Sequence, residues 1–107
     1  MKKTILFSLD FLDLDSAKQV VESALEIALS AHESYYYGGE YYRGIFSGTS
    51  LTLQENFVED DGEPTEPRFP LAKLLLYLEG IEGDVDNVTS VLRSKECVGK
   101  ALRSSTY

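Results

Sequence analysis

Cysteine and histidine are almost absent from this chain, which has one of each, Cys97 and His32. A single cysteine excludes an intramolecular disulfide and a thiolate cluster for zinc. It suits a reducing compartment, so we expect a cytoplasmic protein. Nucleophilic catalysis needs a nucleophile beside a base, and nothing in the spacing brings these two residues together. We interpret His32 as a cap at a helix end and Cys97 as a small buried apolar residue.

Long apolar runs are also missing. No stretch approaches the roughly 18 consecutive apolar residues that a membrane-spanning helix needs. The start, "MKKTILFSLDFLDLD", has two lysines before an apolar run, as a secretory signal does. However, Asp10, Asp13 and Asp15 interrupt that run, and no small-residue cleavage site follows. We therefore expect a core strand at residues 4–9 and no membrane partner.

Basic residues are scarce in the middle of the chain. The net charge is −8, and residues 10–86 hold 17 acidic residues against four basic ones. Such a field repels nucleic acid and anionic membranes, and it attracts a basic partner. Acidic surfaces also keep proteins soluble, so charge alone leaves both interpretations open.

The hydrophobic pattern changes its period along the chain and predicts an α+β fold in a single domain, residues 1–107. Apolar residues alternate over 4–9, as in a strand. They then recur every three or four residues over 16–31, as on one face of an amphipathic helix. Alternation returns after His32, and 40–47 with 50–57 predict a hairpin.

The second half of the chain begins with a proline-rich acidic segment, residues 58–70, which predicts a long exposed loop. Residues 71–81 are apolar on both faces, which favours a central strand, with a helix as the alternative. A second helix is expected from Asp84, and residues 98–102 are expected to form a short helix or an edge element. The predicted order is β-α-β-β-(long acidic loop)-β-α, a mainly antiparallel sheet of about four strands with two or three helices.

The segment "SYYYGGEYYRG", residues 34–44, places five tyrosines around a Gly-Gly pair. The glycines lack the context of a phosphate-binding loop and are typical of a turn. Tyrosine is both an ordinary strand residue and a frequent interface residue. We expect alternate tyrosines to support the sheet and the others to contact a partner. The acidic segments lack the ligand spacing of a calcium loop, so we expect no metal, no cofactor and no catalytic residues.

The stretches "ESYYYGGEYYRG" and "LTLQENF", with an acidic loop leading to "LLLYLEG", resemble small bacterial immunity proteins. These proteins protect a cell from toxins of polymorphic systems, including contact-dependent growth inhibition. The resemblance covers about residues 33–80. It implies inhibition by binding to a toxin domain, often a nuclease, so that its active site is covered. The matching positions are Glu33, Tyr36, Tyr37, Glu40, Tyr41, Tyr42, Arg43, Gln54, Glu55 and Asn56.

We add the loop acids Asp60, Asp61, Glu63 and Glu66 as partner contacts from their charge alone, because carboxylates can occupy the phosphate sites of a basic nuclease. The expected protein is therefore a non-enzymatic inhibitor of a basic toxin, without direct contact to nucleic acid. One alternative is a DNA mimic that inhibits a nucleic-acid-binding protein. A second is a small enzyme that uses a carboxylate pair, since acids this abundant form such a pair by chance.

Overall fold

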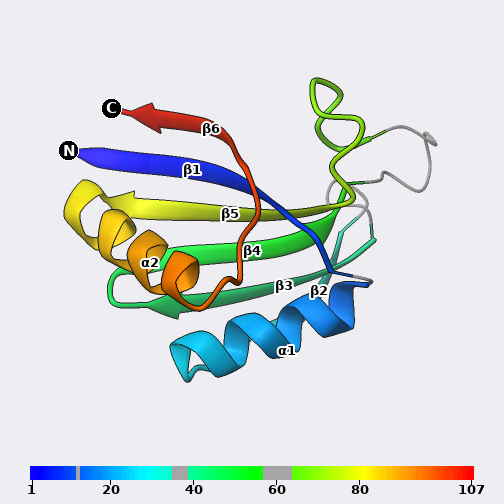
Figure 1. The fold of residues 1–107 in the computed structure, drawn as a ribbon, viewed down its shortest axis with the longest axis horizontal. Helices are drawn as coiled ribbons and strands as arrows, with labels where there is room; N and C mark the ends of the chain where they lie inside the picture. Colours follow the sequence, from blue (N-terminus) through cyan, green and yellow to red (C-terminus); the bar gives the residue numbers. More distant parts are fainter. Residues whose placement is uncertain (12, 35–38, 57–63) are drawn as a thin grey trace.

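The computed structural model describes residues 1–11, 13–34, 39–56 and 64–107. Within them, six strands form one antiparallel sheet in the order β2-β3-β4-β5-β1-β6 (Figure 1). The strands are β1 (Lys2–Leu9), β2 (Ser30–Ser34), β3 (Gly39–Phe46), β4 (Thr49–Glu55), β5 (Leu74–Ile81) and β6 (Ala101–Thr106), and the helices are α1 (Leu14–Leu25) and α2 (Glu82–Ser94). The predicted α+β class is confirmed.

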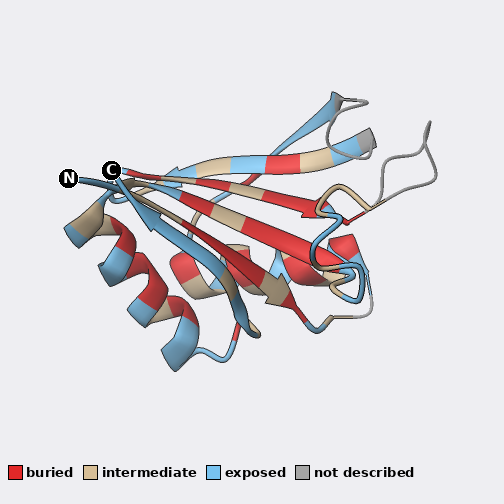
Figure 2. Cartoon of the chain, turned by 90° about the horizontal axis from the view of Figure 1, so that it is seen from above, coloured by how far each residue is buried: buried red, intermediate tan, exposed pale blue. Residues whose placement is uncertain are grey.

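Both helices pack on the same face of the sheet, as Figures 1 and 2 show. Side chains alternate along a strand, so every second residue of the central strands points toward the helices. Most of those residues are apolar and form the main core together with the buried faces of α1 and α2. The strand residues of this core are Ile5, Phe7, Leu9, Leu51, Leu53, Leu74, Leu76 and Leu78. Within the described residues, neither helix is long and apolar enough to cross a membrane.

The opposite face of the sheet is partly covered by the segment 64–73. Leu6 and Leu75 point to this face and are still buried, with 1% and 0% exposure. Glu66 crosses over the face and reaches Tyr77 of β5 and Arg103 of β6. Part of the segment predicted as an exposed loop therefore packs on the sheet.

The helix predicted over 16–31 is confirmed as far as Leu25 and is wrong for residues 26–31. α1 ends before Glu26, whose φ is 55°, and the Glu22 carboxylate accepts a hydrogen bond of 2.8 Å from the backbone N–H of Leu29. Leu29 follows the end of the helix but is buried in the same core, and this is why an apolar residue occurs at a position that fits the helical spacing. Gly44 leaves room for it, since a Cβ there would lie 2.5 Å from Leu29 Cδ2.

The prediction of about four strands omits β2 and β6, which are the two edge strands of the sheet. Edge strands bury little surface, so neither sequence shows the apolar alternation that reveals a strand. His32 lies in β2, and its predicted role as a helix cap is wrong. β6 confirms the edge-element alternative, and β5 confirms a strand within 71–81.

Candidate functional site

Three of the predicted contact residues lie side by side at one end of the sheet. Glu33 of β2 is the register partner of Glu40 of β3, and Glu55 ends β4 one position beyond the last β3–β4 pair. All three are exposed, and strand alternation places them on the face that carries the helices. Together with Asp15, an exposed residue in the first turn of α1, we call them the acidic row.

Tyr42 connects the acidic row to the core. Its side chain is 6% exposed, and its hydroxyl lies 2.8 Å from Oε1 of Glu40 and 3.1 Å from Oδ1 of Asp15. A phenol has one hydrogen to donate, so it can bond only one of these carboxylates at a time. The hydrogen bond to Glu40, burial, and the hydrogen bond to Asp15 raise the pKa of Tyr42 well above its usual range. The hydroxyl therefore stays a donor at neutral pH.

The charges of the acidic row repel one another. Like charges directly opposite on neighbouring strands destabilise a sheet, and Glu33 and Glu40 have this arrangement. Lys18 stands nearby, with Nζ 5.3 Å from the centre of the Tyr42 ring, but it pairs with Glu22 of its own helix at 3.3 Å. A cationic group brought to the row from outside would therefore relieve repulsion.

Asp13 caps the start of α1. Its Oδ1 accepts a hydrogen bond of 2.8 Å from the backbone N–H of Ser16, and this bond lowers the pKa of Asp13. A capping carboxylate satisfies one of the N–H groups that a helix start leaves without a partner. Because Asp13 fills this role, Asp15 remains available to the hydroxyl of Tyr42.

Tyr41 and Arg43, also predicted as contacts, lie on the opposite face of the sheet from Tyr42. The Tyr41 ring stacks on His32 of β2, with ring centres 5.4 Å apart. Nη2 of Arg43 donates to Oγ of Ser50 at 3.5 Å. The two described tyrosines of the segment thus point to opposite faces, as alternation predicts, and the predicted contacts within the described residues lie on both faces of the sheet.

Glu66, predicted as a partner contact, is engaged within the chain. Its carboxylate accepts two hydrogen bonds from Arg103, at 3.0 and 3.1 Å, and one from the Tyr77 hydroxyl at 2.6 Å. Its side chain is 15% exposed. Burial opposes its ionisation, but the hydrogen bonds from Arg103 and Tyr77 outweigh burial and lower the pKa of Glu66. Its charge is therefore largely satisfied inside the molecule.

Asn56, a position included by the resemblance, organises the segment 64–73. Its Nδ2 donates to the carbonyl oxygens of Phe69 and Ala72 at 2.8 and 2.7 Å, and its Oδ1 accepts from the N–H of Glu66 at 2.8 Å. Both amide hydrogens and the oxygen are thus used. The sequence shows only an asparagine after a strand, so this structural role was not predicted.

Five further predicted contacts, Tyr36, Tyr37, Asp60, Asp61 and Glu63, lie outside the described residues.

The described part of the chain contains neither a cluster of metal ligands nor an exposed cysteine. No group of three or more histidine, cysteine, aspartate or glutamate side chains is placed there to hold a metal ion. Cys97 is 2% exposed, and burial raises the pKa of its thiol. A buried neutral thiol is a poor nucleophile, so the interpretation of Cys97 as a packing residue agrees with its position.

The sequence matches no protein-family model, and no curated protein matches it.

Proposed function

We propose that this chain is an immunity protein that binds a cognate toxin domain through the acidic row and covers the toxin's active site. The toxin domain is a basic nuclease, the complex forms in the cytoplasm, and the chain performs no reaction itself. The acidic row carries this proposal, because its exposed carboxylates repel one another and, among the residues that the structure describes, lack a matching set of cations.

Electrostatic complementarity explains why a nuclease surface fits. Such a surface presents lysine and arginine side chains for phosphates, and carboxylates can form charge-assisted hydrogen bonds with the same groups. The hydroxyl of Tyr42 donates to Glu40 or to Asp15 and so restrains one of these two carboxylates at a time before a partner arrives. Less side-chain entropy is then lost on binding. The net charge of −8 adds attraction at longer range.

The proposed binding surface is tested with the toxin domain encoded by the gene immediately upstream, because immunity genes ordinarily lie beside their toxin genes. The double variant Glu33→Lys with Glu40→Lys should bind at least about tenfold more weakly in calorimetry and fail to rescue growth. Glu79→Lys makes the same type of change on the other face of the sheet and should bind like the wild type. Equal affinity for all three proteins would refute the proposed surface.

The non-enzymatic mode of action is tested by stoichiometry. An inhibitor that works by binding abolishes nuclease activity only when it is present in amounts equal to the toxin, and it leaves the toxin's mass unchanged. We expect a linear loss of activity that ends at the equivalence point. Inactivation by small, catalytic amounts of the chain, or a covalent change in the toxin, would contradict the proposal.

A further inference from the structure

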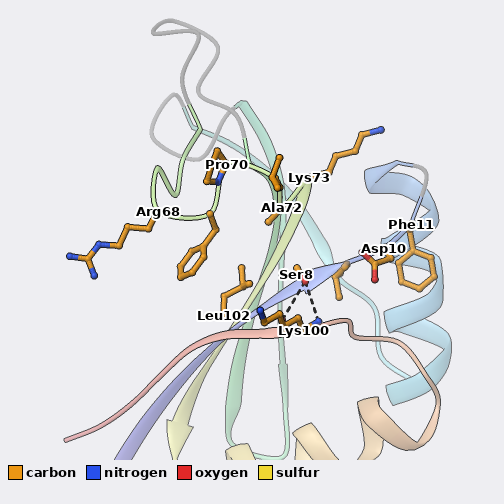
Figure 3. Close-up of a pocket in the computed structure, with 12 residues that line it drawn as sticks. Ser8, Asp10, Phe11, Arg68, Pro70, Ala72, Lys73, Lys100 and Leu102 are labelled. Carbon is orange, nitrogen blue, oxygen red and sulfur yellow. Dashed lines mark hydrogen bonds between the residues drawn. The ribbon is translucent and has the colours of Figure 1, made fainter.

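A second feature, separate from the acidic row, is a pocket at the junction of β1, the segment 68–73 and β6 (Figure 3). Its volume is about 530 Å³, which lies within the usual range for small-molecule sites, about 300 to 1,000 Å³. The apolar part of its lining comes from Leu9, Phe11, Phe69, Ala72 and Leu102. No residue of the acidic row lines it.

The walls of this pocket are held by hydrogen bonds. Asn56 binds the carbonyl oxygens of Phe69 and Ala72, which fixes the wall made by the segment 68–73. On the other side, the backbone N–H of Lys100 donates to Oγ of Ser8 at 3.1 Å, and the backbone N–H of Ser8 donates to the carbonyl of Lys100 at 2.9 Å. The hollow is therefore largely formed before a ligand arrives, which reduces the entropy lost on binding.

The charge around the pocket is opposite to that of the whole chain. Arg68, Lys73 and Lys100 line it, against one acidic residue, Asp10. The complete chain has 10 basic and 18 acidic residues. Figure 3 shows Arg68 and Lys73 on opposite sides of the opening, each directed outward. An anion at the opening would thus meet a local excess of positive charge.

Leu71 adds an apolar surface at the edge of the same pocket. It is 98% exposed, the highest value among the exposed large apolar residues that the structure describes. Covering an exposed leucine with an apolar ligand group removes apolar surface from water and lowers the free energy. The pocket therefore combines an apolar interior, an apolar edge and cations at its opening.

We propose that this pocket binds a small apolar anion, with an aliphatic or aromatic body and one carboxylate or sulfonate group. The body lies on Phe69, Ala72 and Leu102, and the anionic group lies at the opening, in the excess of positive charge from Arg68, Lys73 and Lys100. A neutral apolar compound would gain only the first of these contacts, and a small inorganic anion only the second. This site is independent of the proposed binding of a toxin.

Probes of matched shape test both halves of this site. Octanoate, octylammonium and acetate are titrated into the full chain, and backbone amide shifts of Ala72 and Leu102 are followed by NMR. We expect saturable shifts with octanoate, weaker binding of octylammonium by about tenfold, and no saturation with acetate. Equal affinity for octanoate and octylammonium would overturn the anionic preference. Absence of octanoate shifts at these two amides would overturn the site.

Charge variants test the residues at the opening. Lys73→Glu and Lys100→Glu should each weaken octanoate binding by about three- to tenfold, whereas Asp10→Asn should strengthen it. Lys2→Glu, at the other end of β1, is the matched control and should bind as the wild type does. These side chains are exposed, so folding should be retained, and circular dichroism checks this. An equal effect of Lys2→Glu and the two pocket variants would refute a local charge contact.

Discussion

The ring of Tyr42 belongs to the core, and its hydroxyl contacts acidic residues at the surface. The ring packs in the main core, and the hydroxyl reaches Glu40 and Asp15. Those contacts are favourable only while the phenol keeps its proton, because a phenolate would repel both carboxylates. The stability of the fold should therefore depend on the ionisation of this one side chain.

Tyr42→Phe should remove part of the loss of stability at high pH. An unfolded tyrosine titrates near pH 10, and the folded pKa of Tyr42 is higher. Its contribution is therefore complete below about pH 10 and is lost as pH rises through the folded value. Between these two pKa values the wild type should lose about 1.4 kcal/mol more per pH unit than the variant. Urea unfolding across this range measures the difference, and parallel profiles for the two proteins would contradict it.

Gln54 is a buried polar residue whose side-chain amide makes no hydrogen bond to the described residues. It has 0% exposure, and neither amide atom has a hydrogen-bond partner within the described residues. A buried amide in this state lowers stability. Its position on β4 between Tyr41 and Leu75 places it on the face opposite the helices.

Gln54→Met should stabilise the protein by about 1–3 kcal/mol, since it keeps most of the volume and removes the unpaired amide. The measurement is the urea midpoint with its slope. Gln54→Ala is the control for volume and should destabilise the protein, because it leaves a cavity. A lower midpoint for Gln54→Met than for the wild type would show that the amide contributes a favourable interaction.

At the scale of elements, the segment 64–73 depends on two side chains from other parts of the chain. Asn56 at the end of β4 holds its backbone, and Arg103 of β6 holds Glu66. The segment has neither helix nor strand structure of its own. Its conformation should therefore open locally when either contact is lost, while the sheet remains intact.

Asn56→Ala should free this segment, because it removes the three hydrogen bonds that the Asn56 side chain makes to Phe69, Ala72 and Glu66, at a local cost of about 1–3 kcal/mol. Hydrogen exchange of the Ala72 amide, which donates to Phe69, should accelerate by about tenfold or more. Amides in the centre of β5 should keep their wild-type rates and serve as the internal control. Uniform acceleration over the sheet would indicate global destabilisation instead.

A fall in pH should also open the segment 64–73. The pKa of Glu66 is lowered in the folded protein, so its contribution is present above the usual value of 4.5 and is lost as pH falls through the folded value. Protection of the Phe69 amide, which donates to the Glu66 carbonyl, should decline over that range in the wild type. Glu66→Gln should show weaker protection at neutral pH and little further pH dependence. A wild-type protection that is constant through this range would contradict the assignment.

At the scale of the whole molecule, residues from the two ends of the described chain are neighbours in the sheet. Lys2 and Tyr107 exchange two backbone hydrogen bonds of 2.9 Å. β1 lies between β5 and β6, so the sheet is completed only when the last strand has been added. The two ends are therefore close enough to be joined by a short linker.

A circular permutant that joins residues 1 and 107 by a short glycine linker and opens the exposed turn at Ser47 and Gly48 should fold. We expect a stability within about 1–2 kcal/mol of the wild type, because only loop closure changes. Opening the chain between Phe7 and Ser8 interrupts β1 and should prevent folding. Circular dichroism and urea unfolding test both proteins. Failure of the first permutant would show that the order of strands along the chain matters.

Sequence patterns predict the elements that bury one regular face. The alternation of Leu51 and Leu53, and the apolar run of β5, indicate the central strands because each contributes directly to the core. The same reasoning fails at Leu29, which has helical spacing but is buried from its position between α1 and β2. It also fails for β2 and β6, because edge strands bury too little surface to show a pattern.

The amino-acid sequence by itself determined the excess of acidic residues, the lack of a catalytic or metal motif, and the α+β class, because composition and local periodicity express them directly. Only the tertiary structure decided which residues act together. Asp15 and Glu40 both lie within hydrogen-bond distance of the Tyr42 hydroxyl, Glu66 turns inward to Arg103, and three basic residues gather around an apolar pocket. Each of these contacts joins distant parts of the chain, and strand register and packing, which no local pattern encodes, bring those parts together.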